Sequence, residues 1–262
     1  MRRDPEAAFG PLVLAMALVL GGCAASIGRS SDPGRLAAEI LALSDSTPGA
    51  GWTATGRIQW LVDGRSGRGR VRMLLGDEGR VRVDIEPSGA FGLGGGRATL
   101  WADRDHVLWQ ERGEAPRPID ADQIFAPILG ERATGGDLEL LLLGLSRLGA
   151  RWPPPPWTVA PESSELNLEA IFPDGSMEEA HVTGDPLVMK RLIRRNPGGK
   201  VLFRARFDHF RAVDATPVAG RVDLEAPGEG NTLRVDWDQV TWGKVTPADL
   251  AWPDGYSSSR LR

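Results

Sequence analysis

Apolar and polar residues alternate along most of the chain after residue 50, with a period of two residues. This period is typical of β-strands, because successive side chains of a strand point to opposite faces of the sheet. In the segment 69–75, the apolar residues at odd positions share one face, whereas Arg70 and Arg72 lie on the other. The clearest runs cover 52–62, 69–75 and 80–85, with turn sequences at 63–64 and 76–79. The pattern predicts an antiparallel meander with one apolar and one arginine-rich face.

Similar but shorter runs continue through the rest of the chain. They lie at 97–102, 106–111, 166–171, 176–182, 187–194, 200–207, 219–224 and 233–240. Turn sequences separate several of them, such as Pro173-Asp174-Gly175. We therefore expect about ten strands in one β-rich domain.

The middle of the chain follows a different pattern. Segments 120–129 and 137–148 carry acidic residues at their starts and glycine just past their ends, which are helix start and stop signals. The second segment is rich in leucine on nearly all sides and must be covered by other apolar groups. These features predict a helical lid near 120–148 that interrupts the sheet.

The N-terminus has the organisation of an export signal. Arg2 and Arg3 precede an apolar stretch at 11–20, which is too short for a membrane span of about 20 helical residues. The run Leu20-Gly21-Gly22-Cys23 resembles the bacterial lipobox, and Cys23 is the only cysteine of the chain. The resemblance implies that Cys23 becomes the first mature residue and carries acyl chains such as palmitate. The alternative is an ordinary secretory signal with an incidental cysteine.

We therefore expect a signal peptide at 1–22, a lipidated tether with a short amphipathic helix at 23–47, and a half-barrel domain at 48–262. The helix is predicted from Asp32-Pro33 to about Leu43, with Ile40 on its apolar stripe. The net charge of −4 is unchanged when the signal is removed, and it argues against nucleic acid as a partner. One cysteine excludes a disulfide within the chain.

No group of residues in the sequence has the spacing of a catalytic or metal site. His106, His181 and His209 lie in separate segments without metal-ligand spacing. The glycine-rich run 92–96 is followed by a strand-like segment and lacks the Lys-Ser/Thr of a phosphate loop. We expect neither enzymatic activity nor a cofactor.

Three groups of motifs resemble the bacterial lipoprotein-localisation family of LolA, LolB and related lipoproteins. They are 82–92 (a strand entering a Pro-x-Gly turn), 124–129 with 138–145 (lid helices), and 217–222 with 233–237 (a last hairpin). The resemblance implies a mainly β fold: an unclosed antiparallel barrel of about eleven strands with a helical lid. It also implies a cavity for acyl chains.

The candidate site residues follow from this pattern and this resemblance. The candidates for the acyl-chain cavity and its lid are Trp60, Met73, Val83, Leu100, Trp109, Phe125, Leu141 and Phe203. Side chains of this kind are also what an ordinary core would contain. Phe91 and Leu93 lie in a glycine-rich loop that matches the membrane-inserting loop of the family's outer-membrane receptor. The alternative is that Phe91 folds back onto the sheet.

These features favour a non-enzymatic, membrane-anchored lipoprotein that accepts or carries acylated lipoproteins or other lipids. Ala24 after the cysteine resembles the pattern sorted to the outer membrane, where the protein would face the periplasm as a monomer and meet a periplasmic lipoprotein carrier. A structural or interaction lipoprotein that holds a protein partner on the same scaffold is the alternative. A periplasmic sensor module is a third class, but the sequence shows no additional domain for it.

Overall fold

A computed structural model describes residues 35, 38–40, 42, 51–76, 80–88, 96–103, 106–119, 158–162, 165–184, 186–243 and 245–256. The chain divides into two units, 1–30 and 31–262, and all described residues belong to the second. The predicted signal peptide, most of the tether, the glycine-rich loop at 89–95 and the lid helices near 120–148 lie outside the described residues.

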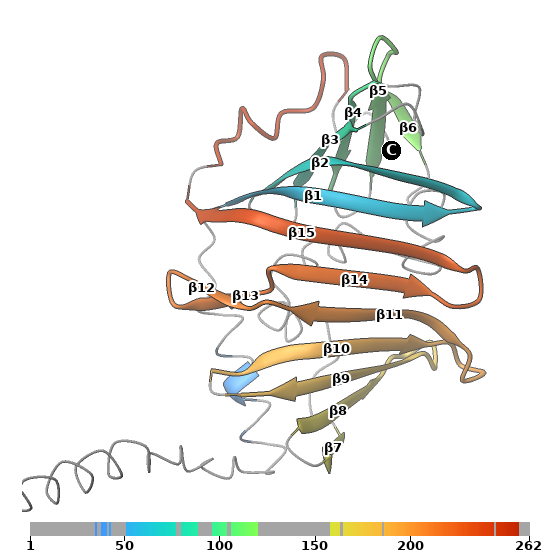
Figure 1. The fold of residues 1–262 in the computed structure, drawn as a ribbon, viewed down its shortest axis with the longest axis vertical. Helices are drawn as coiled ribbons and strands as arrows, with labels where there is room; N and C mark the ends of the chain where they lie inside the picture. Colours follow the sequence, from blue (N-terminus) through green and yellow to red (C-terminus); the bar gives the residue numbers. More distant parts are fainter. Residues whose placement is uncertain are drawn as a thin grey trace, which may run out of the picture. The chain divides into compact units, whose positions relative to one another are not determined.

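The described part of the chain is almost entirely β-structure (Figure 1). The strands are β1 (Trp52–Val62), β2 (Arg65–Leu75), β3 (Val81–Pro87), β4 (Ala98–Ala102), β5 (Val107–Glu111), β6 (Arg117–Ile119), β7 (Thr158–Glu162), β8 (Glu165–Ile171), β9 (Met177–Thr183), β10 (Val188–Arg195), β11 (Val201–Asp208), β12 (Arg211–Val213), β13 (Thr216–Val218), β14 (Arg221–Ala226) and β15 (Asn231–Trp242). Thirteen of them form one open antiparallel sheet, and β12 and β13 form a separate pair.

The large sheet consists of two meanders that meet at its centre. Its order is β6-β5-β4-β3-β2-β1-β15-β14-β11-β10-β9-β8-β7, so the first and last strands of the chain are neighbours. β1 pairs with β15 along its length, from Trp52 opposite Trp242 to Leu61 opposite Thr232. β6 and β7 are the two edges, and the chain between them connects one edge of the sheet to the other.

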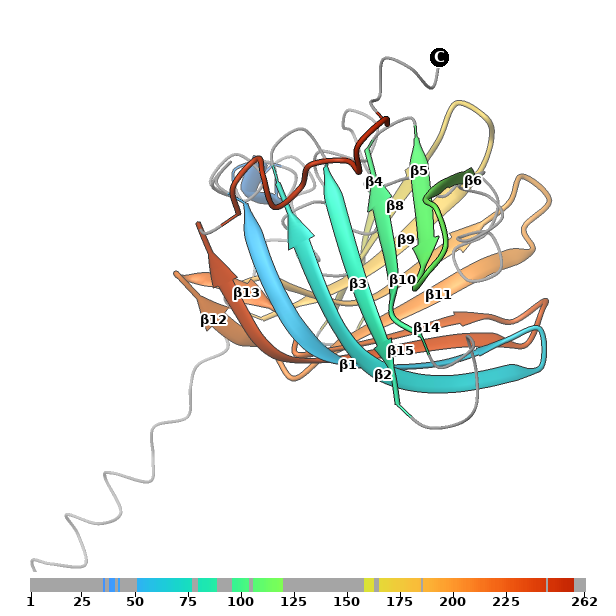
Figure 2. The same ribbon diagram turned by 90° about the horizontal axis from the view of Figure 1, so that it is seen from above.

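One face of the sheet carries the core, and we call it the inner face. Its buried side chains alternate along each strand, as in Ala54 of β1, Met73 of β2 and Phe203 of β11. The sheet curves around this face (Figure 2), so that residues from both meanders belong to one apolar cluster. Described residues of the predicted N-terminal helix are helical, and Ile40 is fully buried in the same cluster.

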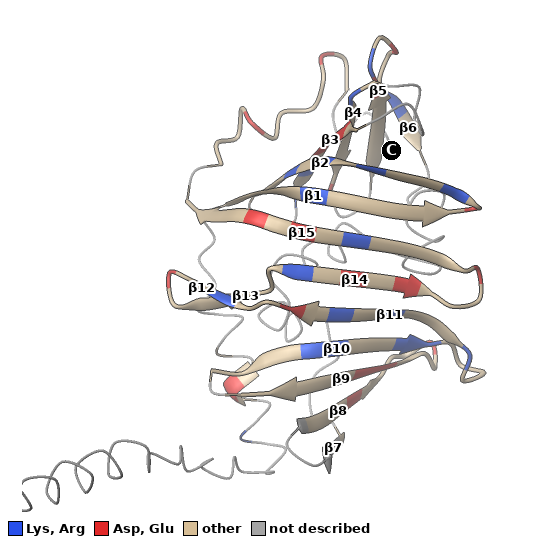
Figure 3. Ribbon diagram, viewed as in Figure 1, with Lys and Arg blue, Asp and Glu red and all other residues tan. Residues whose placement is uncertain are grey.

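Most of the charged residues of the strands occupy the alternate positions that face the opposite, outer side of the sheet. Figure 3 shows where the charged residues lie along the strands. At β2–β5 part of the outer face is covered by residues 245–256, which we call the C-terminal strap. Leu250 of the strap lies against Gly76, Arg82 donates a hydrogen bond to the Asp249 carbonyl at 3.3 Å, and the Tyr256 hydroxyl donates one to the Pro116 carbonyl. The strap gives the outer face its own buried apolar residues there, Leu74, Trp101, Leu108 and Leu250.

The predicted strands are confirmed, with differences at their ends and in their number. β1 has the predicted bounds, but β2 begins four residues before the predicted start. The first residues of β2 were not predicted because Ser66, Gly67 and Arg68 interrupt the apolar pattern. Four short strands, β6, β7, β12 and β13, were not predicted, since they are three to five residues long and three of them contain proline. The sheet therefore has thirteen strands where about eleven were expected.

Candidate functional site

The inner face brings together six of the predicted cavity residues, Trp60, Met73, Val83, Leu100, Trp109 and Phe203. Four of them form one row across neighbouring strands, since Met73 lies opposite Val83, Val83 opposite Leu100, and Leu100 opposite Trp109. Directly paired positions have Cβ atoms about 5 Å apart, so the row is continuous. Phe203 lies in the other meander, and Trp60 lies near the end of β1.

The six residues divide into two groups by exposure. Met73, Leu100 and Phe203 are 3%, 4% and 1% exposed and fill the core. Trp60, Val83 and Trp109 are only partly buried and pack against the cluster. Of the six predicted residues, these three therefore retain surface for a ligand.

An ion pair lies on this apolar face, and the sequence analysis did not identify it. Glu178 of β9 and Arg194 of β10 are directly opposite in register, and the Arg194 Nη2 to Glu178 Oε1 distance is 2.7 Å. Glu178 is fully buried, and the Arg194 guanidinium lies 5.4 Å from the centre of the Phe203 ring. The available signal was that Glu178 and Arg194 occupy apolar positions of their strands, in phase with Ala180 and Leu192.

Five of the predicted site residues cannot be placed, because Cys23, Phe91, Leu93, Phe125 and Leu141 lie outside the described residues. In the described ranges, no helix has both the length and the apolar character needed to cross a bilayer. The roles of these five residues in lipidation, membrane insertion and the lid stay predictions.

The outer face has a trough of about 1060 Å³ across β2, β1, β15, β14, β11 and β10. Two rows of paired positions form it. One runs Ser66, Leu61, Thr232, Glu225, Arg204 and Ile193, and the other runs Arg68, Gln59, Arg234, Asp223, Arg206 and Arg191. Five arginines and two acidic residues line the trough, a local net charge of +3 in a chain whose net charge is −4.

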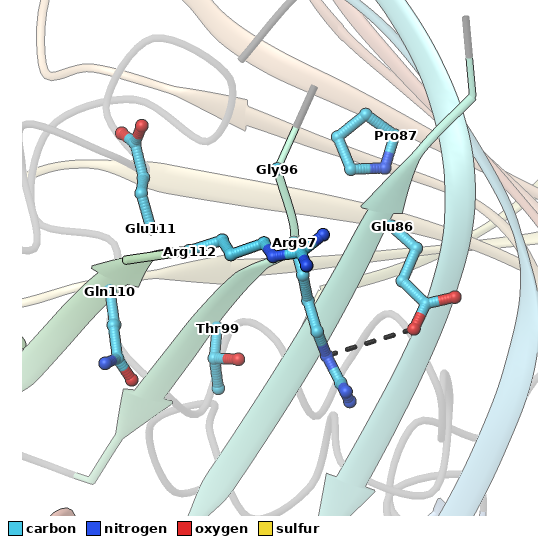
Figure 4. Close-up of a pocket in the computed structure, with 8 residues that line it drawn as sticks. All are labelled: Glu86, Pro87, Gly96, Arg97, Thr99, Gln110, Glu111 and Arg112. Carbon is cyan, nitrogen blue, oxygen red and sulfur yellow. Dashed lines mark ion pairs between the residues drawn. The ribbon is translucent and has the colours of Figure 1, made fainter. Parts of the chain in front are cut away.

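A second, smaller hollow of about 550 Å³ lies on the outer face at β3–β5 (Figure 4). Arg97 extends across it, with its Nε 3.9 Å from Glu86 Oε1 and its Nη2 3.5 Å from Asp84 Oδ2. Asp84 is 2% exposed and also accepts a 2.8 Å hydrogen bond from the Thr99 hydroxyl. Arg97, Asp84, Glu86 and Thr99 are thus linked to one another at this hollow, which indicates a structural network.

The histidines are separated in the structure as well. His181 Nε2 lies 2.8 Å from Glu179 Oε1, and His106 Nδ1 lies 3.4 Å from Asp103 Oδ1. His209 follows β11 and has a positive φ of 55°. Within the part of the chain that the structure describes, no group of three or more His, Cys, Asp or Glu residues has the arrangement of a metal site.

Comparison with known proteins gives structural likeness without sequence likeness. No protein-family model matches the chain, and no curated protein matches it in sequence. A LolA superfamily protein from Nitrosomonas europaea is 14% identical with a TM-score of 0.60, over 82% of this chain and 97% of that one. The chain has a LolA-like fold.

Two further solved structures are similar in the same way. A DUF1329 family protein from Desulfovibrio piger has a TM-score of 0.61 and 14% identity, over 88% of this chain and all of that one. A domain described as an outer membrane lipoprotein-sorting protein, from Vibrio parahaemolyticus, has a TM-score of 0.57 and 11% identity, over 82% and 94% of the two chains. At these identities the likeness defines the fold and leaves the function to be argued from the residues.

Proposed function

We propose that this protein is a non-enzymatic lipoprotein of the bacterial cell envelope whose inner face binds acyl chains of lipoproteins or other lipids. The observation that carries the proposal is the largely apolar inner face of an open sheet, on which Trp60, Val83 and Trp109 are partly exposed. Aromatic and aliphatic side chains on a curved sheet are the lining that an apolar ligand requires. The LolA-like fold supports the same function, because one of the structures similar to it is described as an outer membrane lipoprotein-sorting protein domain.

The proposal includes the membrane anchor. Acylation of Cys23 would hold the protein at the outer membrane, since several acyl chains bind a bilayer far more firmly than one. Incorporation of labelled palmitate into the full chain tests this directly. Labelling that the Cys23→Ser substitution abolishes supports the anchor, and equal labelling of both chains contradicts it.

Acyl-chain binding is tested by titrating the purified full chain with a fluorescent fatty acid. Trp109→Glu places a charge on the inner face at a partly buried position, and Gln110→Glu places the same charge on the outer face of the same strand. We expect at least a tenfold weaker affinity for Trp109→Glu, because a charge in an apolar site costs several kcal/mol, and less than a twofold change for Gln110→Glu. Circular dichroism checks that both variants fold.

A second candidate function is supported by the burial of Met73, Leu100 and Phe203. These side chains already fill part of the inner face, as they would in a scaffold that holds a protein partner and no lipid. Absence of fatty-acid binding, or equal binding by the Trp109→Glu and Gln110→Glu variants, would contradict the lipid function and favour this one. Cross-linking of the full chain in cells, in search of a periplasmic carrier or another partner, would then be the next experiment.

A further inference from the structure

The outer-face trough contains arginines that have no acidic partner. Within the described residues, Arg68, Arg191, Arg204 and Arg206 have no carboxylate within 4.0 Å, although all four are exposed. Three other arginines of the same face are paired: Arg57 with Asp238 at 3.4 Å and Arg221 with Asp236 at 2.6 Å outside the trough, and Arg234 with Asp223 within it. Outside the trough, Arg70 and Arg72 of β2 also lack a described carboxylate within 4.0 Å on this face, so the trough holds the larger group of unpaired arginines.

The register of the strands explains why Arg191 and Arg206 stay unpaired, whereas Arg204 lies directly opposite Glu225 without forming an ion pair. Arg206 lies between Arg191 on one side and Asp223 on the other, but the Asp223 carboxylate accepts a hydrogen bond from Arg234. That bond raises the pKa of Arg234. Arg191 and Arg206 are directly opposite each other, an arrangement of like charges that destabilises a sheet. An anion between them would remove this repulsion.

Exposed apolar side chains lie on the same face of the sheet as these arginines. Among the described residues, Leu61 and Ile171 are the two large hydrophobic side chains that are exposed, at 38% and 70%. Both lie on the outer face. Leu61 is in the row of Arg204, and Ile171 follows the outward-facing Glu169 near the turn of the β8–β9 hairpin. That turn approaches the β10–β11 turn, since a Cβ added to Gly175 would contact Pro197. Arginines and apolar groups thus share one face at one end of the sheet.

We propose that this trough binds the phosphate headgroups of anionic phospholipids and so docks the outer face of the domain onto a membrane surface. Guanidinium groups bind phosphate oxygens with paired hydrogen bonds. Leu61 and Ile171 would enter the boundary between headgroups and acyl chains, which a soluble phosphate cannot provide. The site is distinct from the inner face, so it can be tested independently of acyl-chain binding.

The test uses the full chain carrying Cys23→Ser, so that no acyl anchor contributes, and measures its partition onto vesicles by flotation. The vesicles contain phosphatidylcholine with or without phosphatidylglycerol. Arg204→Gln/Arg206→Gln removes two charges from the trough. Arg57→Gln/Arg70→Gln removes two from the same face outside it. All four positions are exposed, and circular dichroism verifies folding.

We expect phosphatidylglycerol to increase partition of the parent chain onto the vesicles. The partition coefficient of the trough variant on these vesicles should be about 30-fold lower than that of the parent chain, or about fivefold lower per arginine. The control variant should lose less than threefold. Leu61→Ser/Ile171→Ser should also weaken partition, by about tenfold. Equal losses in the trough and control variants would overturn the proposal. The proposal would also be overturned if Leu61→Ser/Ile171→Ser left the partition unchanged and inorganic phosphate displaced the protein from the vesicles. The ligand of the trough would then be soluble phosphate.

Discussion

The Arg194 guanidinium binds the fully buried Glu178 carboxylate at 2.7 Å on the apolar inner face of the sheet. Removing one partner of a buried ion pair takes a compensating charge away from the other, and this costs far more than the pair contributes. We expect Arg194→Met to lower the free energy of unfolding by about 3 kcal/mol, as measured by guanidinium chloride denaturation.

The double variant Arg194→Met/Glu178→Met provides the control for this effect. It replaces both charges with apolar side chains of similar length and should recover most of the lost stability. A double variant as unstable as the single one would show that packing, rather than the uncompensated carboxylate, causes the loss.

Trp60 lies flat across Gly67 of the neighbouring strand, where a Cβ would be only 2.1 Å from Trp60 Cζ2. Gly67→Ala must therefore displace the indole ring, and we expect it to destabilise the protein by about 2 kcal/mol. Combining it with Trp60→Leu should restore part of this stability. Gly198→Ala is the matched control, because a Cβ there makes only one ordinary contact, 3.4 Å from Asn196 Oδ1. A loss of equal size in Gly198→Ala would contradict the steric explanation.

Asp84 links the outer-face network to the C-terminal strap. Its carboxylate binds Arg82 at 3.2 Å, Arg97 at 3.5 Å and the Thr99 hydroxyl, and Arg82 in turn holds the Asp249 carbonyl. We expect Asp84→Ala to cost about 3 kcal/mol and to accelerate hydrogen exchange in residues 245–256. Glu86→Ala removes an exposed carboxylate 3.9 Å from Arg97 and should change stability by less than about 0.5 kcal/mol. Unchanged exchange in the strap of Asp84→Ala would refute the link.

The strap should also respond to pH through Asp249. The backbone N–H of Thr246 and then its hydroxyl donate hydrogen bonds to the Asp249 carboxylate and lower its pKa, with smaller contributions from the charges of Arg72 and Arg82. A lowered pKa means that the ionised form stabilises the strap above the ordinary pKa, and that this stability is lost as the pH falls through the lowered value. NMR amide signals of residues 245–256 should therefore shift with acidification, and Asp249→Asn should abolish that shift.

The sequence predicted features that depend on residues close together in the chain, and it missed features that depend on contacts between distant segments. The turn at Asp63-Gly64 was predicted from its residues, and both have positive φ, 50° and 73°, as a two-residue hairpin loop requires. The early start of β2 was missed, because Gly67 interrupts the alternation and the Trp60 ring that covers it comes from another strand. The apolar row on β2–β5 followed from alternation alone.

The outer-face trough could not be predicted in the same way. Arg191, Arg206 and Asp223 belong to three strands, and their order across the sheet depends on pairings between segments far apart in the chain. The sequence showed an arginine-rich face, but it could not show that the Asp223 carboxylate pairs with Arg234 and leaves Arg206 unpaired. The Glu178–Arg194 pair did have a signal in the sequence, because both charged residues stand at positions where the alternation of their strands calls for apolar residues. This signal becomes informative once β9 and β10 are known to be neighbours.

The pairing of β1 with β15 has a consequence for biosynthesis. A ribosome delivers β1 first and β15 last, so the N-terminal meander has an unpaired edge along β1 until the final strand has been made. Such an edge is a template for pairing with other chains. Contacts that join the two ends of a sequence also form slowly. The edge along β1 therefore stays open to mispairing until the last strand is available, and a chain truncated before Asn231 would keep the aggregation-prone edge permanently.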